Sequence, residues 1–162
     1  MKFDPIRDRR YKLKGMPDTG REPGTVGPVV TMSVNGSPIG VLVDQVERIV
    51  LARDLVAVPD SQPEHLGLLF HDNELVPVMT LHPRKARDEE MVAVVHVRGQ
   101  SVGLSVDDAG RIHSRWEHCQ SEPGERPVDH AVPACAINST FWLIDTDRLW
   151  PRADDTTAAR QQ

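Results

Sequence analysis

Short runs of apolar, mostly β-branched residues recur along the chain and are separated by residues that favour tight turns. The first run, Val29–Val34, is followed directly by Asn35-Gly36, a strong hairpin signal because both residues tolerate positive φ. The next apolar run, Pro38–Leu51, is the expected returning strand. Three further pairs of runs flank turn residues in the same way: Gly67–Phe70 and Leu75–Leu81 around 71–74, Met91–Val97 and Ser101–Val106 around 98–100, and Ala131–Ile137 and Thr140–Ile144 around 138–139.

Four segments lack this pattern. Residues 1–27 contain repeated Pro and Gly, so we expect an unstructured leader there. Residues 83–90 are charged and predict a loop with at most one helical turn. Residues 114–130 are polar and contain Pro and Gly, which predicts a long loop, and residues 151–162 read as a polar tail.

Two local signals modify the strand pattern. Asp145–Trp150 predicts one short C-terminal helix, because Asp145 can cap its start and Pro151 stops it. Pro77 lies inside a predicted strand and lacks a backbone donor, so we expect that strand at a sheet edge or at a bulge.

Many short strands with hairpin turns and almost no helix indicate an all-β barrel or sandwich. With 162 residues, the chain has the length of one domain or of two small subdomains. Strand–turn–strand blocks recur before and after residue 90, so two units of similar design are possible.

The composition and the distribution of charge disfavour some classes of function. Charged residues make up 27% and apolar residues 39%, as in globular proteins, and the net charge is −5. Residues 28–162 carry twenty Asp and Glu against twelve Lys and Arg, which disfavours nucleic acid as a partner. No apolar run approaches a membrane span, and no apolar stretch follows the N-terminal charges. We therefore expect a cytoplasmic protein without direct membrane insertion.

Candidate chemistry is sparse. No phosphate-binding loop or nucleophile motif is present, so we expect no enzyme activity, no catalytic residues and no cofactor. Asp107-Asp108 are neighbours on a strand and face opposite sides, which favours a turn role over proton sharing. Four residues are suitable zinc ligands, but their spacing matches no familiar zinc pattern: His113, His118, Cys119 and Cys135.

The three tryptophans are expected to differ in environment. Trp142 lies in an apolar strand and is expected in the core, and Trp150 is expected to dock the C-terminal helix on a barrel. Trp116 lies in the polar loop, where partial burial is favoured over an exposed contact site.

The order of the apolar blocks is itself informative. It runs through Val29–Val34, Gly40–Ile49, Val58-Pro59, Gly67-Leu68-Leu69, Leu75–Leu81, Met91–Val97 and Val102–Asp108. This order resembles the CheW-like domain, the adaptor module of bacterial chemotaxis arrays. The resemblance covers roughly residues 28–150, and its most specific pieces are Val102-Gly103-Leu104-Ser105-Val106-Asp107 and the Pro-Val strand. It implies two small five-stranded SH3-like barrels packed together.

Three departures from the family pattern stand out. The family turn Asn-Leu-Arg-Gly is here Phe70-His71-Asp72-Asn73, so its arginine is Asp72 and its glycine is Asn73. Asn also accepts the left-handed conformation, so the turn can survive. The family often has glutamate where this chain has Arg48. Residues 114–130 form the third departure, because the resemblance is weakest there.

Both family charges are therefore reversed. If the two positions lie close together, an Arg48–Asp72 pair keeps the attraction with its sign exchanged. An exposed pair contributes only about 0–1 kcal/mol, so its role would be partner choice rather than stability. The family's arginine turn is associated with receptor and kinase contacts. Its replacement by Asp72 therefore argues against ordinary chemoreceptor binding.

The resemblance implies a non-enzymatic adaptor that couples a CheA-type histidine kinase to receptors. The first barrel would contact the kinase's regulatory domain, and the groove between the barrels would face the chemoreceptor. The residues expected at the partner-binding site are Gly40, Val46, Arg48, Gly67, Asp72 and Asn73. Two alternatives stay open: a CheW-like module of another assembly or a decoy, and a barrel that senses a metal or small molecule through residues 114–130.

Overall fold

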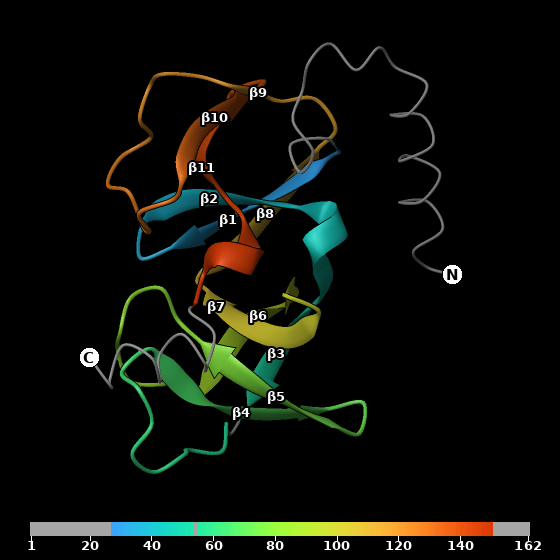
Figure 1. Cartoon of the computed structure of the whole chain (residues 1–162), viewed down its shortest axis with the longest axis vertical. Helices are drawn as coiled ribbons and strands as arrows, with labels where there is room; N and C mark the ends of the chain where they lie inside the picture. The colour runs from blue at the N-terminus through green and yellow to red at the C-terminus, as the bar shows by residue number, and fades with distance from the viewer. Residues whose placement is uncertain (1–26, 54, 151–162) are drawn as a thin grey trace, which may run out of the picture.

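The computed structural model describes residues 27–53 and 55–150, which are built from strands joined by tight turns and by longer loops (Figure 1). The predicted leader, apart from Gly27, and the tail lie outside the described residues. Two 3₁₀ turns interrupt the strands, η1 (Val43–Gln45) and η2 (Thr146–Arg148). The strands are β1 (Val29–Val34), β2 (Ser37–Leu42), β3 (Val46–Arg53), β4 (His65–His71), β5 (Glu74–Met79), β6 (Glu89–Val97), β7 (Gln100–Val106), β8 (Asp108–His113), β9 (Glu117–His118), β10 (Val132–Ala136) and β11 (Ser139–Ile144).

The strands form two packed sheets, as the all-β prediction requires (Figure 1). The six-stranded sheet has the order β8-β1-β2-β11-β10-β9, and the five-stranded sheet has the order β3-β6-β7-β5-β4. The chain is not divided into two sheets at residue 90, where the sequence suggested two units of similar design. The start and end of the described chain share one sheet through the parallel β2–β11 pair, and its middle forms the other.

The apolar run Pro38–Leu51 is not one strand. It breaks at η1, which carries the chain from β2 in the six-stranded sheet to β3 in the five-stranded sheet (Figure 1). Val43 in this turn is buried and joins the core between the sheets. The run therefore stays apolar although its direction changes.

Three hairpins turn at the predicted places, each through two central residues with positive φ, although the sequence predicted longer turns for the second and third. These are Asn35-Gly36, Asp72-Asn73 and Arg98-Gly99. Arg98 is an unusual residue for this conformation. Its backbone N–H donates to Asp147 Oδ1 at 2.5 Å, which ties the turn to η2. The fourth turn lies one residue earlier than expected, because Ala136 pairs with Ser139.

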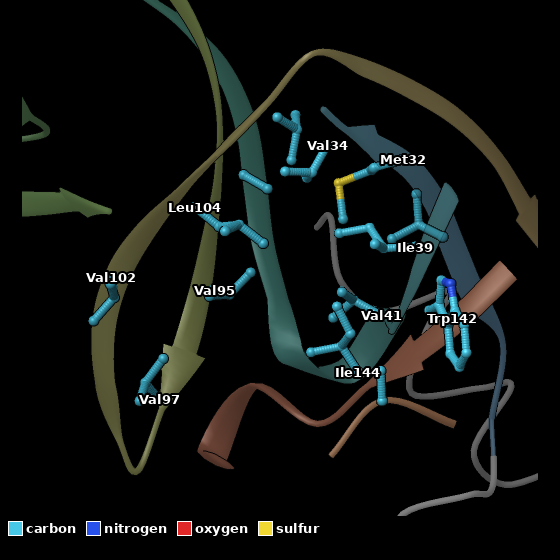
Figure 2. Packing of buried hydrophobic residues seen from close by; sticks show 14 of the residues in the cluster. Met32, Val34, Ile39, Val41, Val95, Val97, Val102, Leu104, Trp142 and Ile144 are labelled. Carbon is cyan, nitrogen blue, oxygen red and sulfur yellow. The ribbon is translucent and has the colours of Figure 1, made fainter. Parts of the chain in front are cut away.

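The main core lies between the two sheets (Figure 2). Side chains alternate between the faces of each strand, so one strand feeds two cores. In β6, Ala93 and Val95 enter the main core, whereas Val92 and Val94 enter a second core behind the five-stranded sheet. In β11, the fully buried Trp142 enters the main core, whereas its neighbours Phe141 and Leu143 enter a third core behind the six-stranded sheet.

The predicted C-terminal helix Asp145–Trp150 is shortened to a 3₁₀ turn. Asp145 caps the turn Thr146–Arg148 as predicted, accepting from Asp147 N at 3.1 Å. Residues 149–150 do not continue the helix, so only this one turn forms. Trp150 is half-buried and packs against the main core, as expected of a docking residue.

Of the two outcomes predicted for Pro77, the edge strand is wrong, whereas a bulge is present beside it, where His65 pairs with Met79 and Gly67 with Val78. β5 lies between β7 and β4. The proline is accommodated because the parallel pairing with β7 involves only Val78 and Met79, after the residue that lacks a backbone donor.

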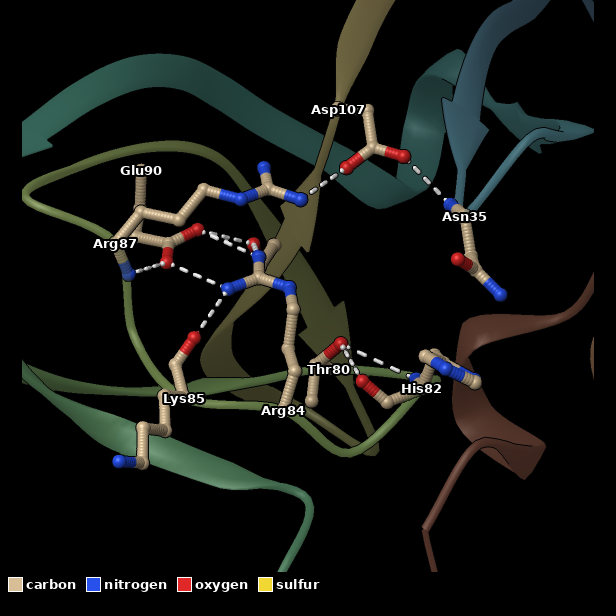
Figure 3. A network of polar contacts seen from close by, with 9 residues as sticks. Asn35, Thr80, His82, Arg84, Lys85, Arg87, Glu90 and Asp107 are labelled. Carbon is tan, nitrogen blue, oxygen red and sulfur yellow. Dashed lines mark hydrogen bonds and ion pairs between the residues drawn. The ribbon is translucent and has the colours of Figure 1, made fainter.

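The charged connection before β6 is anchored by a buried carboxylate (Figure 3). Glu90 is fully buried, and both of its oxygens accept from Arg84, at 2.7 and 2.8 Å. Ser105 Oγ and the backbone N–H of Arg87 donate to it as well, at 2.7 and 2.5 Å. Burial alone would raise the pKa of Glu90, but these donors lower that pKa to about 2. The carboxylate is therefore held charged inside the protein.

The same network joins the two sheets. Arg87 Nη2 donates to Asp107 Oδ1 at 2.9 Å, and Asp107 Oδ2 accepts from the backbone N–H of Asn35 at 2.5 Å (Figure 3). Burial opposes ionisation of Asp107, but these hydrogen bonds leave its pKa below the usual range. Asp107 thus follows β7 and anchors the β1–β2 turn, whereas Asp108 begins β8. The two carboxylates have separate surroundings and do not act as a pair.

Candidate partner-binding face

The Arg48–Asp72 pair predicted from the reversed charges is present. Arg48 lies on β3 beside a bulge at Val46, and Asp72 lies at the tip of the β4–β5 hairpin. Arg48 Nη1 forms an ion pair with Asp72 Oδ2 and lies 2.9 Å from His71 Nε2. Glu47 Oε2 is 3.5 Å from Arg48 Nη2. The hairpin tip is thereby fastened to β3, two elements that are not neighbours in the strand order.

The turn that carries Asp72 keeps its shape without glycine. Asp72 and Asn73 have φ of 53° and 64°, and the flanking residues His71 and Glu74 are paired. The left-handed conformation predicted for Asn73 is confirmed. Asp72 remains 61% exposed and Arg48 40% exposed, so the charged pair is accessible to another protein.

Large apolar side chains are exposed on β3 and on the β4–β5 hairpin, the two elements that carry this pair. On β3, Val50 and Ala52 turn into the second core, so the alternating Ile49 and Leu51 point outward. On the hairpin, Leu69 and Val76 enter the same core, and the cross-strand pair Phe70 and Leu75 points outward. We call the following set the docking face: Arg48, Asp72, Ile49, Leu51, Phe70 and Leu75.

The docking face is unusually apolar for a surface. Phe70 is 65% exposed and Leu75 62% exposed, although neither residue is needed to fill a core. Large apolar side chains left exposed on elements that also carry exposed charges are a feature of protein contact sites. Sequence reasoning missed these four apolar residues because it assigned them to strands without separating inner from outer positions. Their alternation with the core residues was the signal that could have identified them.

Two predicted site residues, Gly40 and Gly67, have packing roles. A Cβ on Gly40 would lie 2.4 Å from Phe141 Cδ2, and one on Gly67 would lie 2.8 Å from the Val56 carbonyl oxygen. Gly67 thereby allows the bridge between Val56 and β4. Gly40 lies in the six-stranded sheet, away from the hairpin tip that carries Asp72. Their role in partner binding stays a prediction.

The remaining predicted residues lie beside the docking face. Val46 is half-buried at the start of β3 and packs against the main core. Asn73 shares the hairpin turn with Asp72. The structure therefore brings Val46, Arg48, Asp72 and Asn73 into one region.

The candidate metal ligands have other contacts. His113 stacks on Phe141 at 6.4 Å, and His118 meets Trp116 edge-on at 5.4 Å. Over residues 27–53 and 55–150, no three His, Cys, Asp or Glu side chains gather in a way that could hold a metal ion. Trp116 is half-buried, as expected, and its Nε1 donates to the Gly27 carbonyl at 2.7 Å.

Residues 114–130 form the predicted loop, except for the short strand β9. Arg126 lies over the Trp142 ring at 4.8 Å and holds the loop against the core. Where the loop ends, an open cleft of about 520 Å³ lies beside η2, lined by Val128, Asp129, His130, Arg148 and Leu149. His130 Nε2 accepts from Asp145 N at 3.1 Å, and burial and the nearby Arg148 lower the His130 pKa.

Comparison with known families decides the classification. The model of the CheW-like domain matches residues 28–153, most of the chain. The chain belongs to the CheW-like domain family. The crystal structure of the scaffolding protein TtCheW from Thermoanaerobacter tengcongensis has the same fold, with a TM-score of 0.64 at 18% identity. The match covers 79% of this chain and 94% of TtCheW.

Two further findings are negative. No match was found among the curated proteins. In the described part of this CheW-like chain, no helix has the length and apolar character that a membrane crossing requires.

Proposed function

We propose that this chain is a non-enzymatic adaptor in a chemotaxis-type signalling system. In this proposal it couples a CheA-type histidine kinase to chemoreceptors in the cytoplasm through protein–protein contacts alone. Membership in the CheW-like family supports this class of function. The observation that carries the proposal is the docking face, in which four exposed apolar side chains lie on the same two elements as an exposed ion pair.

The apolar residues would supply most of the binding free energy. A few large side chains at the centre of an interface commonly dominate affinity, and truncating one of them costs about 2 kcal/mol or more. Phe70 and Leu75 are cross-strand partners beside the hairpin tip, so one partner surface can cover both. We expect them to lie at the centre of the interface with the kinase's regulatory domain.

The charged pair would select the partner. Because Arg48 and Asp72 are both exposed, their attraction contributes only about 0–1 kcal/mol to folding. Charges at an interface rim act mainly on specificity and on the association rate. We therefore propose that the partner presents charges complementary to this arrangement, an acidic group near Arg48 and a basic group near Asp72.

Titration calorimetry tests the proposal. The full chain is titrated with the regulatory domain of a CheA-type kinase from the same organism, and micromolar or tighter binding is expected. Phe70→Ala should weaken binding at least tenfold, about 1.4 kcal/mol. Ile112→Ala is the matched control, because Ile112 is 59% exposed on β8 in the other sheet.

Two results would contradict the proposal. Absence of binding by the folded wild-type chain would remove the kinase as partner. Equal affinities of wild type and Phe70→Ala would remove the docking face as the contact surface. Circular dichroism of both variants confirms that each is folded before titration.

A further inference from the structure

The two cysteines lie side by side at one edge of the six-stranded sheet. β9 pairs antiparallel with β10, with Glu117 opposite Cys135. One step further along, the backbone N–H of Cys119 donates to the Pro133 carbonyl at 3.2 Å. Residues two apart on a strand share a face, so Cys119 lies on the same face as Glu117 and Cys135. Cys119 and Cys135 are therefore diagonal neighbours across the strand pair.

The two thiols interact and remain accessible. Burial, a hydrogen bond with the Cys119 thiol and the nearby Glu117 carboxylate all raise the pKa of Cys135. Both cysteines are free and only half-buried. β9 is the outermost strand of its sheet, so β10 is its only paired neighbour among the described strands. These side chains are thus not core residues, and small reagents can reach them.

We propose that Cys119 and Cys135 form a reversible intramolecular disulfide when the protein meets a peroxide. The link would fasten the edge strand β9 to β10 by a covalent bond. It would also close the segment between the two cysteines, which contains the cleft residues Val128, Asp129 and His130. The position of this segment would then depend on the oxidation state.

The reaction balances with hydrogen peroxide as the oxidant. The Cys119 thiolate attacks one peroxide oxygen, the O–O bond breaks, and the leaving hydroxide takes a proton to become water. The Cys119 sulfenic acid is then attacked by the Cys135 sulfur, the S–O bond breaks, and a second water leaves. Two thiols are oxidised by two electrons in total and one peroxide is reduced. The raised pKa of Cys135 disfavours its thiolate, so we assign the first attack to Cys119.

Intact-mass analysis of the full chain tests the proposal. The reduced protein is treated with hydrogen peroxide, then with N-ethylmaleimide, and its mass and peptide map are recorded without reductant. We expect a monomer lighter by two hydrogens, with neither thiol alkylated and with Cys119 joined to Cys135. Dithiothreitol should restore two alkylatable thiols.

Single variants provide the controls. In Cys135→Ser, Cys119 should form a sulfenic acid that dimedone traps, whereas in Cys119→Ser, Cys135 should stay alkylatable at the same peroxide dose. The proposal is overturned if both wild-type thiols remain alkylatable. It is also overturned if only an intermolecular disulfide or an overoxidised single cysteine forms. This outcome is independent of the adaptor proposal, because the docking face lies on the other sheet.

Discussion

Replacing Glu90 by alanine should destabilise the protein far more than a surface change of the same type. Glu90 is fully buried, and its carboxylate accepts from Arg84, Ser105 and the backbone of Arg87. Arg84 is itself only 21% exposed. Removing the carboxylate therefore leaves a largely buried guanidinium without its main partner, which is costlier than losing a pair exposed to water.

Two independent routes give the same magnitude. The pKa of Glu90 falls from 4.5 to about 2. At about 1.4 kcal/mol per pKa unit, this depression corresponds to about 3 kcal/mol in favour of the folded, charged state. Breaking one partner of a buried pair commonly costs about 3–5 kcal/mol. For a chain of this length, a loss of about 3 kcal/mol lowers Tm by about 6–12 °C.

Urea unfolding followed by tryptophan fluorescence measures the loss, because Trp142 is fully buried in the main core. The neighbouring residue gives the control. Glu89 pairs with Arg53 at 2.7 Å but is 47% exposed, so Glu89→Ala should cost less than about 1 kcal/mol. If Glu90→Ala is no more destabilising than Glu89→Ala, the account of the buried network is wrong.

Three further predictions concern pH, packing and charge. Because the folded pKa of Glu90 is depressed, its stabilisation is fully present above the unfolded pKa of 4.5 and is lost as pH falls towards about 2. Urea titrations at stepped pH should therefore show a shallower loss of stability for Glu90→Gln than for wild type, and equal slopes would contradict this. Gly40→Ala should cost about 1–3 kcal/mol in urea unfolding, because its Cβ would lie 2.4 Å from the Phe141 ring, and an unchanged midpoint would disprove the clash. Combining Arg48→Asp with Asp72→Arg should restore the small part of the unfolding free energy that either single change removes, but not the kinase affinity measured by calorimetry. Wild-type affinity of the double variant would show that the sign of the two charges does not select the partner.

Some of the fold follows from short-range chemistry. Asn35-Gly36 was predictable as a turn because few residue pairs adopt positive φ at both positions, and Arg98-Gly99 because it lies between two apolar runs and contains glycine. The Arg48–Asp72 contact was predictable for a different reason, because two charges differ together from the family pattern and the structure places them in contact.

Other features depended on tertiary contacts that the local sequence does not reveal. The stretch around Glu90 has the composition of a solvated loop, and only the donors of Arg84 and Ser105 make its burial favourable. The end of β2 was hidden because Val43 is apolar whether it continues a strand or turns into the core. The helix predicted at Asp145 had a correct cap, but Pro151 leaves only the five residues 146–150 after it, which is too short a segment to stabilise a longer helix.

Hydrogen–deuterium exchange of the full chain, with and without the regulatory domain of the CheA-type kinase, tests the central claim most directly. The docking face predicts that the kinase slows exchange in β3, Val46–Arg53, and in the β4–β5 hairpin, His65–Met79. The strands of the six-stranded sheet, such as β8 and β10, should exchange as in the free protein. Protection confined to those strands, or no protection at saturating kinase, would contradict the assignment of the docking face.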